Sequence, residues 1–344
     1  MEALERARVR YRVRSVRWGF YWAMWCAVLW GLWYVPGTAI WYEEPFASLT
    51  AAGGREEFLL AAAVITCLSS FAVLLFLFIW TGVLEKWGEI GRTFRQVRIT
   101  KWFFIAAIFG GPCAMFGSFL AIGFVGPVFA AIAALMYPVI GAPLAQLWYN
   151  EKISARAATG IFIILVGGVS IYAPGVLGEF NSPDGNAWIG YLGGFLAAVG
   201  WGIEGAIAGR VLDVSDPDVG NTIRFAAECL YWALLILPLM AWITGADVMT
   251  IITSAFSFWS MLWILLSGAC FAFCYASWYK SFPLIGVGRG QAIGALYAVF
   301  AVIFLSIFTL DLPEWHFLIG LTLTVIGGFV MFTERSEMLE VIRG

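Results

Sequence analysis

Charged residues are scarce in this sequence of 344 residues. Asp, Glu, Lys and Arg together make up 12% of the chain, whereas about a quarter is usual in a soluble domain. Hydrophobic residues make up 62%, and the mean hydropathy is +0.87. This composition excludes a soluble globular protein and indicates an integral membrane protein.

Histidine and cysteine are too few, or too dispersed, to form the metal sites and disulfide frameworks that they usually support. The one histidine, His316, lies beside Glu314, with no cysteine or cluster of acids near it. The six cysteines all fall within apolar stretches, where thiols act as small apolar fillers. We therefore expect no disulfide framework, no metal site and no cofactor. A polytopic membrane enzyme needs a nucleophile, a base or metal ligands at one depth, and is the less favoured alternative.

Ten apolar stretches of roughly 20 residues are present, each long enough to cross a hydrocarbon core about 30 Å thick as a helix. The sequence therefore predicts an all-α integral membrane protein with ten transmembrane helices. The first five spans are expected near 18–40, 58–80, 102–122, 127–149 and 155–173. The second five are expected near 187–209, 222–244, 258–279, 286–309 and 315–333. Pro36, Pro112, Pro138 and Pro238 are expected to interrupt their helices.

The two halves share a short pattern. Adding 160 to Met136-Tyr137, Glu151, Gly160 and Gly167-Gly168 gives Leu296-Tyr297, Asp311, Gly320 and Gly327-Gly328, and Trp30-Gly31 recurs as Trp201-Gly202 with a shift of 171. Five spans per half force the second copy to enter the membrane from the opposite side. We therefore expect two inverted five-helix repeats, a plan typical of secondary transporters. The expected divisions are a basic N-terminus (1–17), a first repeat (18–173), a connecting loop (174–186), a second repeat (187–333) and a C-terminus (334–344).

Lysine and arginine favour one side of this topology. With the N-terminus inside, each of the 20 basic residues except Arg55 lies in or beside a cytoplasmic segment. Cytoplasmic loops of membrane proteins hold such an excess. We therefore expect a multi-pass protein of the cell (cytoplasmic) membrane with both termini cytoplasmic. An arginine run before a first span is a topology signal that meets anionic lipid, so no nucleic-acid partner is expected.

Several of these residues form a recognisable set. Ala27-x-x-Trp30-Gly31, the turn Asn150-Glu151-Lys152-Ile153-Ser154, and Gly160 with Gly167-Gly168 resemble the EamA-type members of the drug/metabolite transporter superfamily, over nearly the whole chain. The second half departs from that pattern, because Thr309-Leu310-Asp311-Leu312-Pro313 replaces a Gly-Glu turn. The resemblance implies two inverted repeats, a central cavity and alternating access. It also implies substrates that range from amino acids and metabolites to cationic drugs and nucleotide sugars.

Glu204 lies well inside the sixth predicted span and has no basic residue within four positions. A charged carboxylate at such depth costs at least about 2.5 to 3.5 kcal/mol, so an intramembrane acid is a functional candidate by default. Its counterpart in the first half is Trp33, so the acid is not a shared architectural feature. We expect Glu204 to bind substrate and to be a candidate for proton coupling. The structural alternative is a protonated carboxyl group hydrogen-bonded across helices.

Aromatic residues make up 17% of the chain and include 18 tryptophans. Some lie at span ends, where an interfacial belt is expected: Trp18, Trp41, Trp87, Trp102 and Trp188. Six others lie deeper, in helices that line the cavity of the resembling family: Trp30, Trp33, Tyr34, Tyr137, Trp201 and Tyr297. Aromatic faces attract organic cations by roughly 0.5 to 2 kcal/mol each. The same rings also serve as plain helix packing.

Other polar groups near the spans have more than one interpretation. Arg289 and Gln291 begin the ninth span, where they either bind the carboxylate of a zwitterion or extend to the inner surface. Arg224 and Glu228 are one turn apart and predict a structural ion pair. Lys280 ends its helix and is expected to be an interfacial anchor. No basic residue is expected at the midplane, which disfavours a phosphate or nucleotide-sugar substrate.

Together these residues predict a secondary transporter that moves a small organic cation, such as a methylated or quaternary amine of choline or betaine type. Glu204 is expected to balance the positive charge, and the deep aromatic rings to enclose the methyl groups. The alternative within the same superfamily is a metabolite, amino-acid or drug exporter, in which Glu204 binds an ammonium group and Arg289 a carboxylate. A channel is less favoured, because no acidic ring or filter-like loop is evident.

Overall fold

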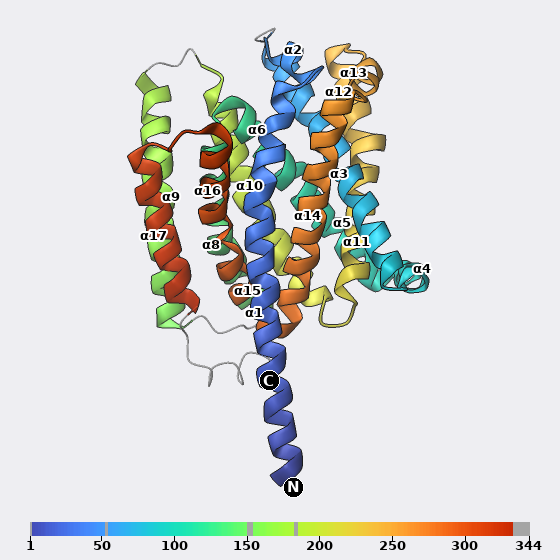
Figure 1. Cartoon of the computed structure of the whole chain (residues 1–344), viewed down its shortest axis with the longest axis vertical. Coiled ribbons are helices and arrows are strands. Elements are labelled where there is room, and N and C mark those ends of the chain that lie inside the picture. Colours follow the sequence, from blue (N-terminus) through green and yellow to red (C-terminus); the bar gives the residue numbers. More distant parts are fainter. Residues whose placement is uncertain (1, 52–53, 150–153, 182–184, 333–344) are drawn as a thin grey trace.

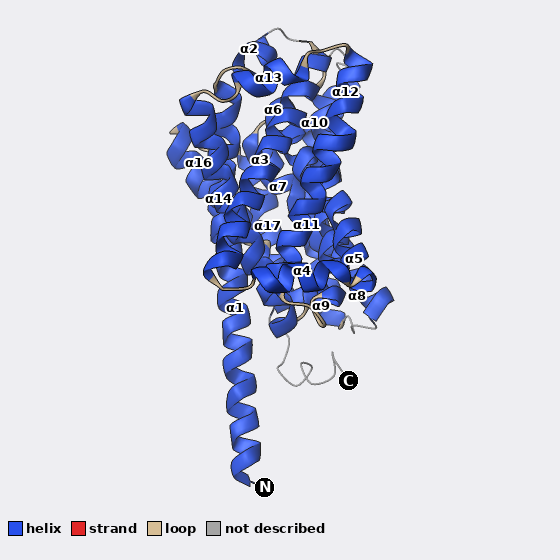
Figure 2. Ribbon diagram, turned by 90° about the vertical axis from the view of Figure 1, so that its right-hand side faces the viewer, coloured by secondary structure: helices blue, strands red, loops and turns tan. Residues whose placement is uncertain are grey.

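The computed structural model describes residues 2–51, 54–149, 154–181 and 185–332. Every regular element in those ranges is helical, and the long helices run along one axis of the molecule (Figures 1 and 2). Eight segments within the described ranges are long and apolar enough to cross a membrane. The all-α prediction is therefore confirmed for the described residues, and the segments are those of a multi-pass membrane protein.

The eight segments correspond to eight of the predicted spans. They are formed by α1 (Glu2–Ala39), α3 (Arg55–Val83), α5 (Val97–Ile108) with α6 (Phe116–Phe124), α7 (Pro127–Ala133) with α8 (Tyr137–Tyr149), α10 (Ala187–Val211), α11 (Pro217–Tyr231) with α12 (Leu237–Thr244), α14 (Phe258–Ile285), and α15 (Val287–Gly294) with α16 (Tyr297–Thr309). The other two predicted spans fall on α9 (Ala155–Asn181) and α17 (Trp315–Phe332), whose apolar stretches are shorter. The turn at 150–153 and the segment 333–344 lie outside the described residues.

Short helices occupy three of the connections: α2 (Phe46–Ala51), α4 (Trp87–Arg95) and α13 (Val248–Ser254). The connection between the halves is shorter than the expected 174–186, because α9 continues to Asn181, the first of a run of turn-forming residues. The start of α11 is fixed by Asp216, whose carboxylate accepts hydrogen bonds from the backbone N–H groups of Asp218 (2.9 Å) and Val219 (3.1 Å).

Three spans contain an irregular turn beside a proline. A π-turn at Phe109–Met115 includes Pro112, a second at Trp232–Ile236 precedes Pro238, and a 3₁₀ turn at Ala134–Met136 precedes Pro138. Proline lacks an N–H donor and clashes with the carbonyl four residues earlier, so the backbone rearranges over that turn. The predicted interruptions are confirmed at these three positions, whereas Pro36 lies inside α1.

The centre of the bundle is formed by α1, α10 and α14, with α9 and α17 paired at one side (Figure 1, left). Glycines allow close approach there. A Cβ at Gly31 of α1 would lie 2.8 Å from the Tyr297 carbonyl oxygen, and one at Gly202 of α10 would lie 2.8 Å from the Tyr137 carbonyl oxygen. Helices in membranes associate through such close packing of small residues.

Two glycines also form the sharp corners before α7 and α15. Gly126 has φ of 128° and Gly286 has φ of 83°, values that favour glycine because it lacks a Cβ. These positions again differ by 160, so each half turns at the same point of its pattern. The helix that follows each corner is also broken at the same place, just before Tyr137 in one half and just before Tyr297 in the other.

Large apolar side chains cover much of the outer surface, for example Trp242, which is 81% exposed. Soluble monomers rarely expose apolar patches of this extent, whereas lipid would cover them. Four of the five tryptophans assigned to the interfacial belt are exposed: Trp18, Trp87, Trp102 and Trp188. The assignment is wrong for Trp41, which is 7% exposed and packs against Phe58.

Candidate functional site

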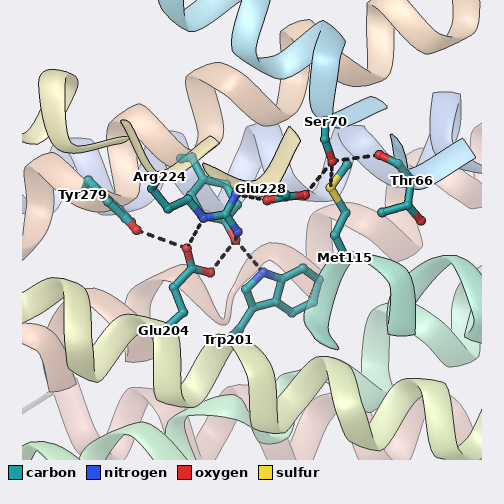
Figure 3. Close-up of polar contacts among 9 residues, drawn as sticks. Thr66, Ser70, Met115, Trp201, Glu204, Arg224, Glu228 and Tyr279 are labelled. Atoms are coloured by element: carbon teal, nitrogen blue, oxygen red, sulfur yellow. Dashed lines mark hydrogen bonds and ion pairs between the residues drawn. The ribbon is translucent and has the colours of Figure 1, made fainter. Parts of the chain in front are cut away.

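The most deeply buried charges of the described residues belong to α10 and α11. Glu204, Arg224 and Glu228 are all 0% exposed. Arg224 Nε donates to Glu204 Oε1 at 2.6 Å, and Arg224 Nη1 donates to Glu228 Oε2 (Figure 3). The guanidinium therefore lies between two carboxylates. We call these three residues the charged triad.

Hydroxyl groups from two other helices complete the polar contacts of the triad. Tyr275 and Tyr279, one turn apart on α14, donate to Glu204 Oε2 at 2.7 Å and to Glu204 Oε1 at 3.1 Å. Ser70 of α3 donates to Glu228 Oε1 at 2.5 Å. Four helices thus hold the triad, and its carboxylate oxygens are supplied with donors, as buried charges require.

The triad holds two carboxylates against one guanidinium, which leaves one carboxylate in excess when both are ionised. The predicted pair of Arg224 and Glu228 is confirmed. Glu204 has no basic residue within four positions on its own helix, and no basic residue was expected deep within the spans. That expectation is wrong, because the buried Arg224 reaches Glu204 from the neighbouring helix. The sequence window around Glu204 contains no cation, and a contact between helices is not visible in such a window.

The π-turn of the third span lies against the triad. A Cβ at Gly110 would overlap with Arg224 Nη2 and with Glu204 Oε2, and one at Gly111 would lie 2.5 Å from Glu228 Cδ. Only glycine therefore fits at these positions without moving the charged groups. π-Turns often occur at functional sites. The Gly-Gly-Pro sequence at 110–112 is a usable signal for this turn, of which only the interruption at Pro112 was predicted.

The six deep aromatic residues predicted from the sequence are all buried and form one aromatic cluster: Trp30, Trp33, Tyr34, Tyr137, Trp201 and Tyr297. The Trp30 ring stacks on Tyr297, with ring centres 4.3 Å apart, and meets Trp201 edge to face at 4.6 Å. Trp201 Nε1 donates to the Tyr275 hydroxyl at 2.7 Å. This hydrogen bond joins the aromatic cluster to the charged triad.

Residues of α14 extend the cluster and were not predicted. Phe271 stacks on Trp33 with ring centres 4.6 Å apart, and Trp278 lies 5.9 Å from Trp30. Together with Tyr275 and Tyr279 they occupy positions i, i+4, i+7 and i+8, which lie on one face of a helix. This spacing is the sequence signal that could have identified α14 as a wall of the site.

Tyr137 and Tyr297 make reciprocal hydrogen bonds. The Tyr137 hydroxyl donates to the Gln291 carbonyl oxygen at 2.5 Å, and the Tyr297 hydroxyl donates to the Ala131 carbonyl oxygen at 2.6 Å. Both the two donors and the two acceptors differ by 160 in the sequence. Each phenol thus ties its own broken helix to the broken helix of the other half, while its ring packs against Trp30.

Arg289 and Gln291, the remaining predicted site residues, are also buried, at 8% and 0% exposure. This burial does not fit side chains that extend to the surface. A Cβ at Gly205, the residue after Glu204, would overlap with Gln291 Nε2, so the amide lies against α10. The structure therefore brings Gln291 to the helix that carries Glu204.

A second group of charges lies at the end of the bundle from which α1 starts. Lys86 Nζ lies 2.7 Å from carboxylate oxygens of both Asp216 and Asp218, and Lys280 Nζ lies 2.9 Å from Asp218 Oδ1. Lys280 is therefore a partner of α11 rather than only the predicted interfacial anchor. Burial lowers the pKa of Lys86, but its hydrogen bonds to the two aspartates raise the pKa by more, so the net shift is upward from 10.5.

Surface cavities of about 380, 280 and 280 Å³ lie away from Glu204 and the six predicted aromatics. The side chains of the triad and the aromatic cluster are at most 1% exposed, so both are closed to solvent in this structure. Within the described ranges, no group of three or more His, Cys, Asp or Glu residues is placed to hold a metal ion.

Comparison with known proteins gives a fold but no function. No family model matches the sequence, and no curated protein matches it. A solved structure described as "Crystal structure of protein" is similar, with a TM-score of 0.54 and 16% sequence identity over 93% of this chain and 98% of that one. At this identity the similarity shows a shared fold alone.

Proposed function

We propose that this protein is a secondary transporter, not an enzyme, that moves a small organic cation across the cell membrane by alternating access. The charged triad is the cation site and the aromatic cluster is its apolar wall. One observation carries the proposal: a carboxylate in excess over its guanidinium partner, 0% exposed and joined to buried aromatic rings through Tyr275.

We also propose ten spans arranged as two inverted repeats, the plan of the EamA-type drug/metabolite transporters that the sequence resembles. The reciprocal hydrogen bonds of Tyr137 and Tyr297 support it. The pairing of α9 with α17 supports it too, since a Cβ at Gly167 would lie 2.9 Å from the Gly320 carbonyl oxygen and one at Gly327 would lie 2.6 Å from that of Gly160. Such exchanged contacts are expected of repeats related by a pseudo-two-fold axis.

The distribution of basic residues supports an orientation with the N-terminus in the cytoplasm. Helix α4, which carries Arg92 and Arg95 in its last turn, lies at the same end of the bundle as the start of α1 (Figures 1 and 2). The connections from α10 to α11 and from α14 to α15 lie at this end as well. The positive-inside rule makes it the cytoplasmic end.

The charge balance of the triad determines which sign of charge a substrate needs in order to bind there. A buried carboxylate without a compensating charge is costly, so an organic cation or a proton is favoured beside it. Arg224 is already matched by two carboxylates, which leaves it poorly suited to bind a phosphate. A proton that replaces the departing cation would keep the site neutral, and in this way couple substrate movement to proton movement.

The aromatic rings supply the rest of the affinity. Arg224 itself lies over the Tyr275 ring, with Cζ 4.8 Å from the ring centre, so this ring already accepts a cation on its face. A methylated ammonium group gains roughly 0.5 to 2 kcal/mol from each such face when water is excluded. Access to this closed site requires opening of the bundle, and the broken helices α7–α8 and α15–α16 are natural hinge positions.

The test is counterflow in proteoliposomes with labelled methylated amines such as choline and trimethylamine. We expect internal unlabelled substrate to stimulate uptake by the wild type, as a carrier but not a channel requires. Glu204→Gln should lower uptake by about 10-fold or more, because it removes a charge-assisted contact of roughly 1.5 to 3 kcal/mol. Glu56→Gln, at an exposed position, is the matched control and should transport normally. Wild-type uptake by Glu204→Gln would refute the proposed cation site.

A further inference from the structure

Three uncharged polar side chains in or beside the aromatic cluster lack hydrogen-bond partners among the described residues. They are the indole N–H groups of Trp30 and Trp278 and both polar atoms of the Gln291 amide. These side chains are at most 1% exposed. We call them the amide–indole group.

The members of this group lie together around Tyr137. The Trp30 and Trp278 ring centres are 5.9 Å apart, and the Tyr137 ring lies 5.5 Å from the first and 6.2 Å from the second. The Tyr137 hydroxyl is bonded to the Gln291 carbonyl oxygen. A Cβ at Gly205 would meet both the Gln291 amide and, at 3.2 Å, Trp278 Cζ2. The group thus lies beside α10, adjacent to the residue that follows Glu204.

This concentration of unsatisfied groups needs an explanation. Each buried polar group without a partner costs about 1 to 3 kcal/mol, and the large majority of such groups in native proteins are satisfied. Trp41 and Trp232 also have unpartnered indole N–H groups among the described residues, but they lie elsewhere, against Phe58 and Phe116. Within the part of the chain that the structure describes, the amide–indole group is where unpartnered indole and amide groups meet next to the candidate substrate site.

The architecture of the bundle does not require the Gln291 amide. Subtracting 160 from 291 gives Ala131, and the carbonyl oxygens of both residues accept a tyrosine hydroxyl. The backbone role is therefore the same in both halves, whereas a polar side chain is present in only one. The same asymmetry holds for Glu204, whose counterpart is Trp33. Both polar side chains are additions to a symmetric frame.

The chemistry of the group defines what it binds. An indole N–H can only donate, and an amide supplies two further donors together with an acceptor oxygen. None of the three side chains carries a charge. We propose that the amide–indole group is the second half of the substrate site and binds a neutral acceptor oxygen of the substrate. The substrate class is then an amine that also bears a hydroxyl, ether or carbonyl oxygen. This inference rests on the proposed cation transport.

A matched pair of ligands tests it: choline and ethyltrimethylammonium, which differ by one hydroxyl group. Affinities are measured on the purified full-length protein by isothermal titration calorimetry. We expect the wild type to bind choline about 10-fold or more tightly than ethyltrimethylammonium. The reason is that the polar groups of the site pair with the choline hydroxyl but stay unpaired when ethyltrimethylammonium binds. Gln291→Leu should abolish this preference, which is measured as the ratio of the two affinities in the same variant.

Matched variants provide the controls. Gln146→Leu makes the same change at an exposed position of α8 and should keep the preference. Trp278→Phe removes one indole donor of the group and should reduce the preference, whereas Trp232→Phe removes an unpartnered indole elsewhere and should not. The tryptophan pair also provides the test if Gln291→Leu does not fold.

The outcomes separate this inference from the proposed function. Equal affinity of the wild type for the two ligands would overturn the inference and leave cation binding intact. Tighter binding of glycine betaine than of choline would overturn the proposal that the group binds a neutral oxygen, because it would show that the site prefers a carboxylate. Binding of neither choline nor ethyltrimethylammonium would overturn both proposals.

Discussion

Arg224 determines what the buried acids of this protein can do. Its guanidinium is planar and permanently charged, and it donates to Glu204 through Nε and to Glu228 through Nη1. Loss of one partner of such a buried set typically costs about 3 to 5 kcal/mol. The depth of Glu204 could be predicted from hydropathy alone. Its partner could not, because Arg224 is 20 residues away on another helix and no local pattern encodes how two helices face each other.

Lys86 provides a prediction at the scale of one residue. Its pKa is raised above 10.5 by hydrogen bonds to Asp216 and Asp218 that outweigh its burial. The stabilisation is therefore fully present below pH 10.5, the ordinary value of an unfolded chain, and is lost as the pH rises through the higher folded-state pKa.

We expect Lys86→Met to lower the free energy of unfolding by about 1 kcal/mol at neutral pH, and the difference from wild type to shrink as the pH is raised above 10.5. Thermal unfolding in detergent as a function of pH measures both effects. Lys101→Met, at an exposed position, is the control. A difference that is independent of pH would contradict the assignment.

The π-turn at Phe109–Met115 provides a prediction at the scale of one element. A methyl group at Gly110 would occupy the position of Arg224 Nη2. We expect Gly110→Ala to displace the guanidinium, destabilise the protein by about 1 to 3 kcal/mol through overpacking, and abolish uptake of methylated amines. Thermal unfolding and proteoliposome uptake measure these effects.

Gly91→Ala is the matched control for this variant, because nothing lies within 4 Å of a Cβ at Gly91 in α4. We expect it to leave uptake unchanged and stability equal or slightly higher, since alanine favours a helix over glycine. Wild-type uptake by Gly110→Ala would contradict a role for the π-turn in positioning the triad.

Helix boundaries and irregular turns could both be predicted only in part. Apolar length predicted α10 closely, at 187–209 against the observed Ala187–Val211, but α1 begins at Glu2 rather than at 18 and α9 continues to Asn181 rather than 173, because a helix can extend beyond its apolar stretch. Pro112 and Pro138 marked where helices break. Whether a break becomes a π-turn or a 3₁₀ turn depends on what packs against it, here the charged triad at Gly110. That information lies in other segments of the chain.

At the scale of the molecule, the pattern shared by the two halves of the sequence indicated which positions correspond, and hydropathy did not. The shift of 160 that relates Tyr137 to Tyr297 also relates the carbonyl groups that they bind. The shift of 171 between Gly31 and Gly202 relates two glycines that pack on those same tyrosines. The repeat therefore predicted corresponding positions. It did not predict which helices touch across the halves, because both partners of each contact are distant in sequence.

Asp218 provides the prediction that belongs to the whole molecule. Its carboxylate accepts from Trp80 Nε1 at 2.9 Å and pairs with Lys86 and Lys280, so it ties α3, α11 and α14 together at the end where the chain begins. The alternating access that we propose requires such a closure to be reversible. Asp218→Asn removes both ion pairs, worth about 1 kcal/mol in total for partly exposed partners, and should raise the population open at this end several-fold.

Hydrogen–deuterium exchange measures that shift directly. We expect Asp218→Asn to speed exchange several-fold in the first turns of α11 and the last turns of α14, because these backbone amides are protected only while the end is closed. Asp311→Asn, an exposed change at the opposite end of the bundle, should leave the same amides unaffected. Choline should slow exchange in both proteins if it binds a closed state. Unchanged exchange in Asp218→Asn would contradict this prediction, because it would mean that packing alone keeps this end closed and that the ion pairs contribute nothing to the closure.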